Sequence, residues 1–302
     1  MNTHFRIAHL SDLHLTEKDS DRRLEPKLPG NRLQGMNKSF AELLNSDKIR
    51  NSDIILVTGD VTDKGELPAW KNFDKILREA GVRDRTHIVI GNHDICGVDA
   101  FFRLSDRRRL RAFDVSRLKR SLSEIGFRHD YPWVEILRED IALFGIDSNN
   151  AGNAGSHDNA IGRIGKFQLE ALARLLRKHR DIPIKIVALH HSPNMPERAT
   201  QVRRKGTADP EWVRYTHEIP QEDRWALRYM ALSHGVRLMV HGHLHEDEDR
   251  RVNGIRIIGA PSSTQPVTEG ARSFFQFNRY DFVKTDANSY RINREVCRVN
   301  LT

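Results

Sequence analysis

Short runs of β-branched and other apolar residues recur along the chain, and each is closed by a polar residue or a glycine, as is typical of buried strands. The predicted strands lie at 5–10, 54–58, 87–90, 141–146, 184–189, 236–240 and 255–258. Stretches with the period of a helix separate several of them, at 36–44, 70–80, 167–180 and 222–233. This alternation predicts an α/β fold with a largely parallel sheet, whose active site gathers beyond the carboxyl ends of the strands.

The pattern changes after Gly235, where strand follows strand up to two runs at 273–282 and 289–299. We expect a second, more antiparallel sheet there. Two segments, at about 96–120 and 192–221, match neither a helix nor a strand, and long connections of this kind are usually functional or disordered. A layered α/β fold can reach 302 residues as one unit, so we expect a single domain over 1–302 with these two inserted segments.

Composition narrows the class of protein. The longest uninterrupted apolar run, at 141–146, is far shorter than the roughly 18 residues of a membrane span, so no such span is expected. Two cysteines, Cys96 and Cys297, cannot form a disulfide framework, and the first ten residues lack the apolar core of a signal peptide. We therefore expect a cytoplasmic protein. Its net charge of +8 favours anionic partners such as phosphate esters, nucleotides or nucleic acid.

Five of the predicted strands end in strings of polar side chains, and seven of the fifteen histidines fall inside these strings. The strings lie at 11–14, 58–60, 90–94, 189–192 and 241–245. Taken singly, Asp12 or Asp60 could cap a helix, Asn92 could be a turn residue and His190 a core histidine. These separate explanations would have to coincide at five strand ends, so a shared site is the better interpretation.

The last string adds a geometric argument. On an extended strand end His241, His243 and His245 point to one side, where three imidazoles are favourable only around a cation. Mixed carboxylate, imidazole and amide ligands suit Mn, Fe, Zn or Co. Seven candidate ligands are too many for one tetrahedral zinc ion and suit two metal ions, which predicts two divalent transition-metal ions sharing a carboxylate. Such ions lie about 3.5–4 Å apart and activate a bridging water for in-line attack, so the natural substrate is a phosphate ester.

The strings together read D-x-H, G-D, G-N-H-D, H and G-H-x-H, in order from Asp12 to His245. In this the chain resembles the calcineurin-like metallophosphoesterases. The resemblance implies a four-layer α/β sandwich, with two mixed sheets flanked by helices and a binuclear metal site at the strand carboxyl ends. It also implies the metal ligands: Asp12, His14 and His245 on one ion, Asn92, His190 and His243 on the other, and Asp60 between them.

The same resemblance implies the catalytic residues. His93 corresponds to the family's non-ligand histidine, which contacts the phosphate together with Asn92 and protonates the leaving group, and Asp94 is expected to orient it. Where two histidines adjoin, the family pattern puts the ligand first, which selects His190 over His191. His241 has no counterpart in the pattern.

We expect a metal-dependent phosphodiesterase acting on a small, nucleotide-like phosphate ester, with cyclic nucleotides among the candidate substrates, by in-line attack of a metal-bridging hydroxide. Many family members acting on small diesters continue with His-His-Pro-Pro, whereas here Ser192 precedes Pro193, which weakens the case for cyclic nucleotides. The main alternative is a nuclease of the same fold, because the segment from Arg103 to Arg120 is rich in arginine and could bind nucleic acid. A phosphomonoesterase is less favoured, and a non-catalytic scaffold least, since every motif residue is present.

Overall fold

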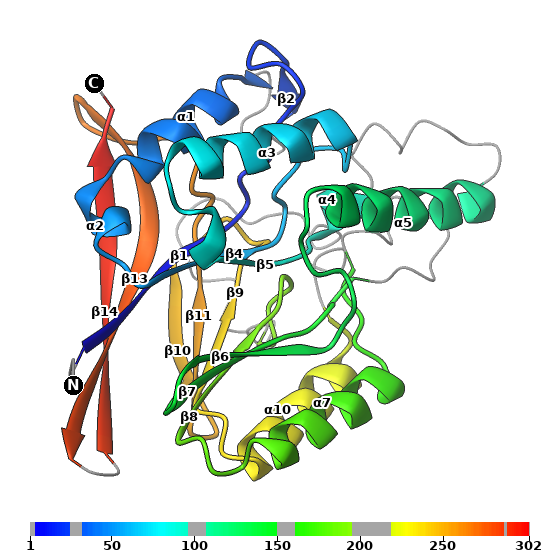
Figure 1. Cartoon of the computed structure of the whole chain (residues 1–302), viewed down its shortest axis with the longest axis vertical. Helices are drawn as coiled ribbons and strands as arrows, with labels where there is room; N and C mark the ends of the chain where they lie inside the picture. The colour runs from blue at the N-terminus through cyan, green and yellow to red at the C-terminus, as the bar shows by residue number, and fades with distance from the viewer. Residues whose placement is uncertain are drawn as a thin grey trace.

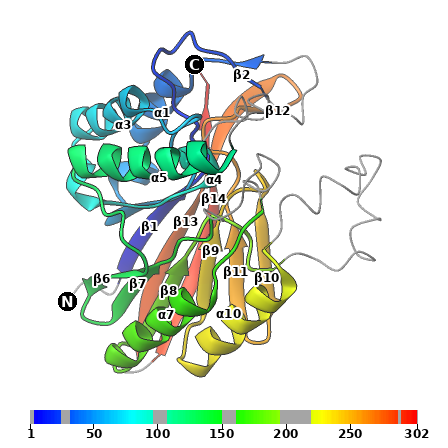
Figure 2. The same ribbon diagram turned by 90° about the vertical axis from the view of Figure 1, so that its right-hand side faces the viewer.

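The computed structural model describes residues 4–24, 32–95, 107–149, 161–194, 219–286 and 289–301. Within them, two six-stranded sheets pack face to face and helices cover the outer face of each, giving the four layers visible in Figures 1 and 2. The expected four-layer α/β sandwich is therefore confirmed. None of the described helices is both long and apolar enough to cross a membrane.

The first sheet has the strand order β12-β13-β1-β4-β5, with β14 paired to β13. Strands β1, β4 and β5 are parallel, and β13 runs antiparallel to β1. The bounds are β1 His4–Leu10, β4 Ile54–Thr58, β5 Thr86–Val89, β12 Val267–Glu269, β13 Arg272–Asp286 and β14 Ser289–Asn300. The helices along this part of the chain are α1 Met36–Leu44, α2 Asp47–Arg50, α3 Leu67–Glu79, η1 Arg83–Arg85, α4 Asn92–Ile95 and α5 Arg107–Glu124.

The second sheet has the order β10-β11-β9-β8-β7-β6. Its four central strands are parallel, and β6 and β10 are antiparallel edges. The bounds are β6 Trp133–Arg138, β7 Ile141–Gly145, β8 Ile184–Ala188, β9 Leu238–His241, β10 Glu248–Val252 and β11 Ile255–Gly259. Helices α7 Lys166–Lys178 and α10 Gln221–Ser233 cover it, and a small separate pair is formed by β2 Arg23–Leu24 and β3 Arg32–Leu33.

Three hydrophobic clusters hold the layers together. One lies between the first sheet and its helices and includes Phe40 and Trp70, and another joins the second sheet to α7 and α10. The third fills the space between the sheets, with Ile7, Leu56 and Ile186 among its members. Central strands are thus buried on both faces, as in β4, where all five residues are buried. This explains why the sequence shows continuous apolar runs there rather than alternation.

The seven strands and four helices expected from periodicity all occur, with bounds shifted by a few residues at most. The strands after Gly235 do not form the expected second, more antiparallel sheet among themselves. Strands β9, β11 and β10 complete the second sheet, whereas β12, β13 and β14 return to the first. A strand edge left unpaired is unfavourable, and β13 covers the free edge of β1, a pairing that alternation along the chain does not encode.

The two unassigned segments are described only in part. Helix α5 occupies 107–124, so the second half of the first segment is helical. Residues 96–106 and 195–218 lie outside the described part of the chain, as do the side chains of residues 107–114.

Candidate metal centre

Most of the predicted ligands lie just after a strand and have a left-handed backbone conformation. Six described non-glycine residues have a positive φ, and five of them are predicted ligands: Asp12 (53°), His14 (50°), Asp60 (49°), His243 (70°) and His245 (52°). This left-handed region is sparsely populated by residues with a side chain, and each such residue costs about 1–3 kcal/mol and persists only where the surrounding structure imposes it. The sandwich holds these residues in conformations that aim their side chains at a common point.

Glycines allow the loops to approach one another closely. A Cβ on Gly242 would lie 1.8 Å from Ser11 Oγ and 2.6 Å from Asp12 Oδ2, and one on Gly59 would lie 2.4 Å from His190 Nδ1. Real contacts of this kind are longer than 3 Å. The glycines of the G-H and G-D strings are therefore required by the closeness of the loops.

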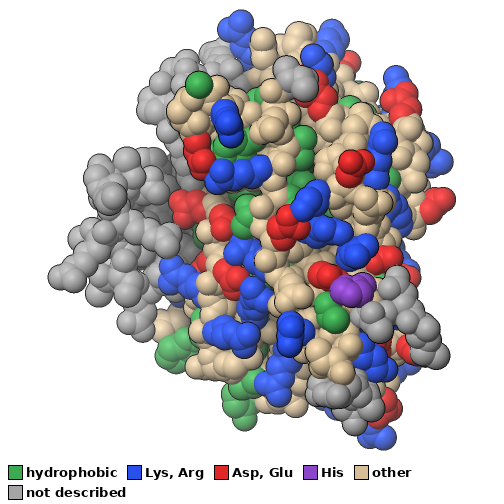
Figure 3. Space-filling model, turned by 90° about the vertical axis from the view of Figure 1, so that its left-hand side faces the viewer, with side chains coloured by type: hydrophobic (Ala, Val, Ile, Leu, Met, Phe, Trp, Pro, Cys, Tyr) green, Lys and Arg blue, Asp and Glu red, His purple; other side chains and the backbone are tan. Residues whose placement is uncertain are grey.

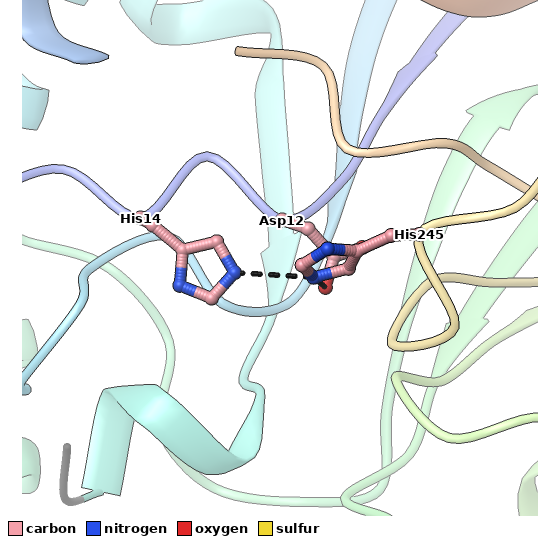
Figure 4. A group of neighbouring side chains, drawn as sticks. All are labelled: Asp12, His14 and His245. Atoms are coloured by element: carbon pink, nitrogen blue, oxygen red, sulfur yellow. Dashed lines mark hydrogen bonds and ion pairs between the residues drawn. The ribbon is translucent and has the colours of Figure 1, made fainter. Parts of the chain in front are cut away.

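The first half of the site contains Asp12, His14 and His245, which face one another from two sheets (Figure 4). His14 Nε2 lies 3.3 Å from His245 Nε2, and His245 Nε2 lies 3.3 Å from Asp12 Oδ1. One ligand atom from each residue lies within 4.8 Å of the others. The Asp12 carboxylate also accepts the backbone N–H of His243, at 3.0 Å, which links the first half to the second.

The second half gathers around His190. Its Nδ1 donates to the backbone carbonyl of Thr58 at 2.8 Å, which leaves Nε2 free to act as a ligand. Nε2 lies 3.1 Å from Asn92 Oδ1, 3.1 Å from His243 Nδ1 and 3.4 Å from Asp60 Oδ2. Four potential ligand atoms from four different loops therefore converge.

Asp60 belongs to both halves, because its Oδ2 also lies 3.7 Å from His14 Nε2. Burial alone would raise the pKa of this carboxyl, but the facing His190 and His93 outweigh burial and hold it below its usual value. Burial likewise opposes protonation of His190, yet Asp60 and Asp12 raise its pKa to about 9. Buried carboxylates, imidazoles and an amide oxygen in this arrangement are a donor set that fits two divalent transition-metal ions.

His93 lies at the edge of the centre. Its ring packs edge to face against that of His14, with the ring centroids 4.6 Å apart, and its backbone N–H donates to Asp60 Oδ1 at 2.9 Å. Its Nδ1 donates to the backbone carbonyl of Asp63 at 3.1 Å and lies 3.7 Å from the Asp63 carboxylate. Asp63 also faces His14 Nδ1 at 3.5 Å.

The expected pairing of Asp94 with His93 is corrected by these contacts. The Asp94 carboxylate accepts the backbone N–H groups of Gly91 (2.8 Å) and Thr62 (2.8 Å) and the Thr62 hydroxyl (2.9 Å). Burial, and then the nearby Asp60, raise its pKa to about 7 in spite of these bonds. Asp94 thus ties the loop after β5 to the loop after β4, and Asp63 is the carboxylate beside His93. Only its position three residues after Asp60 in G-D-V-T-D marked Asp63 in the sequence.

The three histidines after β9 do not share a side. His241 Nε2 lies 3.3 Å from Glu248 Oε2 in β10, away from the two ligand groups, whereas His243 and His245 belong to them. The expectation rested on extended backbone, and the left-handed conformations of His243 and His245 remove that condition. Of the adjacent pair, His190 faces Asp60, and His191 Nδ1 contacts Ser148 Oγ instead.

A cavity of about 380 Å³ adjoins Asp63. Its lining is mostly charged or polar: Leu15, Thr16, Glu17, Asp21, Arg22, Asp63, Lys64, Glu66 and Ala69. Side chains of both signs face it, so it suits a polar group better than an apolar one.

Comparison with known proteins agrees with this geometry. A family model described as calcineurin-like phosphoesterase matches residues 5–247. A 3′,5′-cyclic-nucleotide phosphodiesterase of Nostoc sp. is 23% identical over 264 residues, covering 85% of this chain and 77% of that protein. A protein of Arcobacter nitrofigilis described as a probable glycerophosphodiester phosphodiesterase is 22% identical over 212 residues, covering 67% of this chain and 65% of the other.

Among solved structures, a dimetal phosphatase from Danio rerio matches with a TM-score of 0.62 at 14% identity, covering 97% of this chain and 96% of the other. At this identity the likeness concerns the fold alone. The family model covers most of the chain, including every motif from Asp12 to His245. The chain therefore belongs to the calcineurin-like phosphoesterase family.

Proposed function

We propose that the protein is a metal-dependent phosphodiesterase that hydrolyses small, nucleotide-like diesters. The proposal rests on the position of Asp60, whose buried carboxylate faces His14 of one ligand group and His190 of the other. His93 lies beside it and donates its backbone N–H to the same carboxylate. Both relatives described above carry names of diester hydrolases, which supports a diester over a monoester.

In this proposal Asp12, His14 and His245 hold one divalent ion and Asn92, His190 and His243 hold the other, with Asp60 shared. Bound there, two Mn, Fe, Zn or Co ions supply an activated water and neutralise charge developing on the phosphoryl oxygens. The protein contributes rigid ligand positions, because the loops are tied by backbone hydrogen bonds such as His14 N to Asp60 O at 2.9 Å.

His93 is the proposed general acid, and Asn92 and His93 bind the phosphoryl group. Donation of Nδ1–H to the Asp63 carbonyl fixes the ring, so that Nε2 is the atom that carries the proton to the departing oxygen. The Asp63 carboxylate lies 3.7 Å from Nδ1, on the same side of the ring as this carbonyl, and helps to hold the ring in that orientation. Asp63 is therefore a positioning residue, and Asp94 maintains the loop that carries His93.

The test is the dependence on the leaving group. General acid catalysis contributes about 10²–10⁴-fold, and it matters most when a poor leaving group such as an alkoxide departs. With Mn²⁺ bound, His93→Ala should lose that much activity on an alkyl or nucleotide diester and far less on bis(p-nitrophenyl) phosphate. Asp63→Asn should show the same selectivity, smaller in size.

The matched control is His190→Ala, which removes a proposed ligand and should reduce activity equally on both substrates. Equal losses for His93→Ala on both substrates at full metal occupancy would show that His93 only positions the phosphoryl group. Hydrolysis of phosphomonoesters but of no diester would reject the proposed function itself.

The nuclease alternative rests on the arginine-rich segment, and the described part of that segment gives it little support. Arg117 in α5 donates to the backbone carbonyls of Lys64 (3.0 Å) and Ile95 (3.2 Å), so this arginine braces the fold.

On the face of β13 and β14 drawn in Figure 3, Lys and Arg are interspersed with Asp and Glu. Lys48 pairs with Glu295 of β14, and Arg298 of β14 with Glu269 of β12. No continuous basic stripe covers the described part of that face.

A further inference from the structure

Ser148, which follows β7, touches both histidines of the adjacent pair. Its hydroxyl oxygen accepts the backbone N–H groups of His190 (3.2 Å) and His191 (3.0 Å), and it lies 2.9 Å from His191 Nδ1. Ser148, His190 and His191 are all fully buried. A serine hydroxyl has two acceptor positions and one hydrogen, so the two backbone groups occupy the acceptors and the hydrogen must go to His191 Nδ1.

These contacts fix which nitrogen of the His191 ring carries the proton. Nδ1 accepts a hydrogen bond, so the neutral ring carries its proton on Nε2. The ring packs against two proposed ligands at once, with centroid distances of 5.0 Å to His190 and 4.3 Å to His243. A rotation of His191 would therefore displace both of them.

Asn149, which follows Ser148, and Tyr131 brace the same half of the site. Asn149 Nδ2 donates to the carbonyl of Ile90 at 3.0 Å, and the Tyr131 hydroxyl accepts the N–H of Ile90 at 3.1 Å. Ile90 precedes Gly91 and Asn92 directly, so its peptide sets where the Asn92 loop begins. The segment after β7 thus contacts both the loop that carries Asn92 and the loop that carries His190.

We propose that Ser148 is a positioning residue for the metal half-site formed by Asn92, His190 and His243, acting through His191. The proposal rests on the proposed function for the identity of the ligands. It predicts that Ser148 affects the binding of one ion and leaves the ion held by Asp12, His14 and His245 nearly unchanged.

The experiment compares Ser148→Ala with Ser52→Ala. Ser52 is also buried and lies just beyond the end of α2, outside both ligand groups. Its hydroxyl donates to the Lys48 carbonyl at 2.8 Å, so the control likewise loses one serine hydrogen bond. Calorimetric titration of the metal-free protein with Mn²⁺ should show two binding events in the wild type. In Ser148→Ala one of them should weaken by about 10- to 100-fold, as when a residue that orients a metal ligand is lost. Ser52→Ala should match the wild type.

A second measurement reads His191 directly. Nitrogen-15 spectra of the histidine rings in the metal-free protein should place the His191 proton on Nε2 with Nδ1 as acceptor, the signal being assigned by its absence in His191→Phe. Ser148→Ala should lose this acceptor signature. Because His191→Phe already removes the acceptor atom, adding Ser148→Ala to it should weaken metal binding by less than the sum of the separate effects.

Two unaltered binding events in Ser148→Ala, or equal weakening of both ions, would overturn the proposal. A wild-type His191 protonated on Nδ1 would also overturn it. These readouts involve no catalysis, so a protein that binds two ions but hydrolyses no diester would reject the proposed function and leave the role of Ser148 standing.

Discussion

Substitution of Gly59 by alanine tests how closely the site is packed. Gly59 follows β4 with φ at +95°, and a Cβ there would lie 2.4 Å from His190 Nδ1, 2.7 Å from His190 Cγ and 2.9 Å from Gly91 Cα. Ordinary contacts begin at 3.4 Å. Neither neighbour yields easily, because Gly91 is backbone and His190 Nδ1 is bonded to the Thr58 carbonyl. We expect His190 to move by roughly 1 Å, and a misplacement of that size can reduce catalysis by about 100-fold.

Gly81 provides the matched control. Its φ is +67°, and a Cβ would meet nothing within 4 Å. Gly81→Ala and Gly59→Ala therefore share the strain of left-handed backbone, about 1–2 kcal/mol, and only the second adds the clash. Hydrolysis of bis(p-nitrophenyl) phosphate, Mn²⁺ content and urea unfolding are measured for both. Gly59→Ala should lose activity about 100-fold and bind less metal, whereas Gly81→Ala should lose stability alone. Activity within twofold of wild type for Gly59→Ala would refute the close packing of His190.

Three further predictions concern metal content, acid stability and nucleic acid. Asp60→Ala should remain folded by circular dichroism but retain fewer than two ions after Mn²⁺ loading, because it loses the shared carboxylate; two retained ions would contradict the assignment. Burial, and then the nearby His241 and Arg294, lower the pKa of His9 from 6.5 to about 3, and Asp12 opposes this shift. The His9 ring is hydrogen-bonded to the hydroxyl groups of Thr58 and Tyr280. Below pH 6.5 the unfolded chain therefore binds one proton more than the folded protein, so the free energy of unfolding falls as the pH falls from 6.5 towards 3, by about 2 kcal/mol at pH 5. Urea unfolding of His9→Gln should lack this loss. An equal loss in both proteins would exclude His9 as its source. If the nuclease alternative holds, single-stranded DNA binding should weaken with salt, and replacing Arg107, Arg108 and Arg109 by alanine should flatten the log–log slope by about two; absence of binding at low salt would eliminate it.

Buried central strands and edge strands could be predicted from the sequence to different extents. Parallel strands buried on both faces are continuous apolar runs, so β4 and β8 could be located from local composition. Charged edge strands such as β10, with the sequence Glu-Asp-Arg-Arg-Val, lack that signal and were missed. The return of β13 to the edge of β1 was also missed, because pairing between strands more than 260 residues apart leaves no trace in periodicity.

The sequence by itself determined the fold class and which strand ends carry the candidate ligands. Carboxyl ends of parallel strands lie at one edge of a sheet, so the polar strings after β1, β4 and β5 meet in the first sheet and those after β8 and β9 in the second. That rule depends only on local pattern and chain direction, and it accounts for the closeness of Asp12 and Asp60, whereas the packing of the two sheets brings His190 to within 3.4 Å of Asp60.

Only the tertiary structure decided which neighbouring side chain does what. Asp63 rather than Asp94 lies beside His93, His241 turns away to Glu248, and Ser148 contacts the His190–His191 pair. These outcomes depend on left-handed backbone at single residues and on two sheets meeting with close tolerances. Residues adjacent in sequence then point in different directions, and residues far apart share a hydrogen bond, so neither relation can be recovered from spacing along the chain.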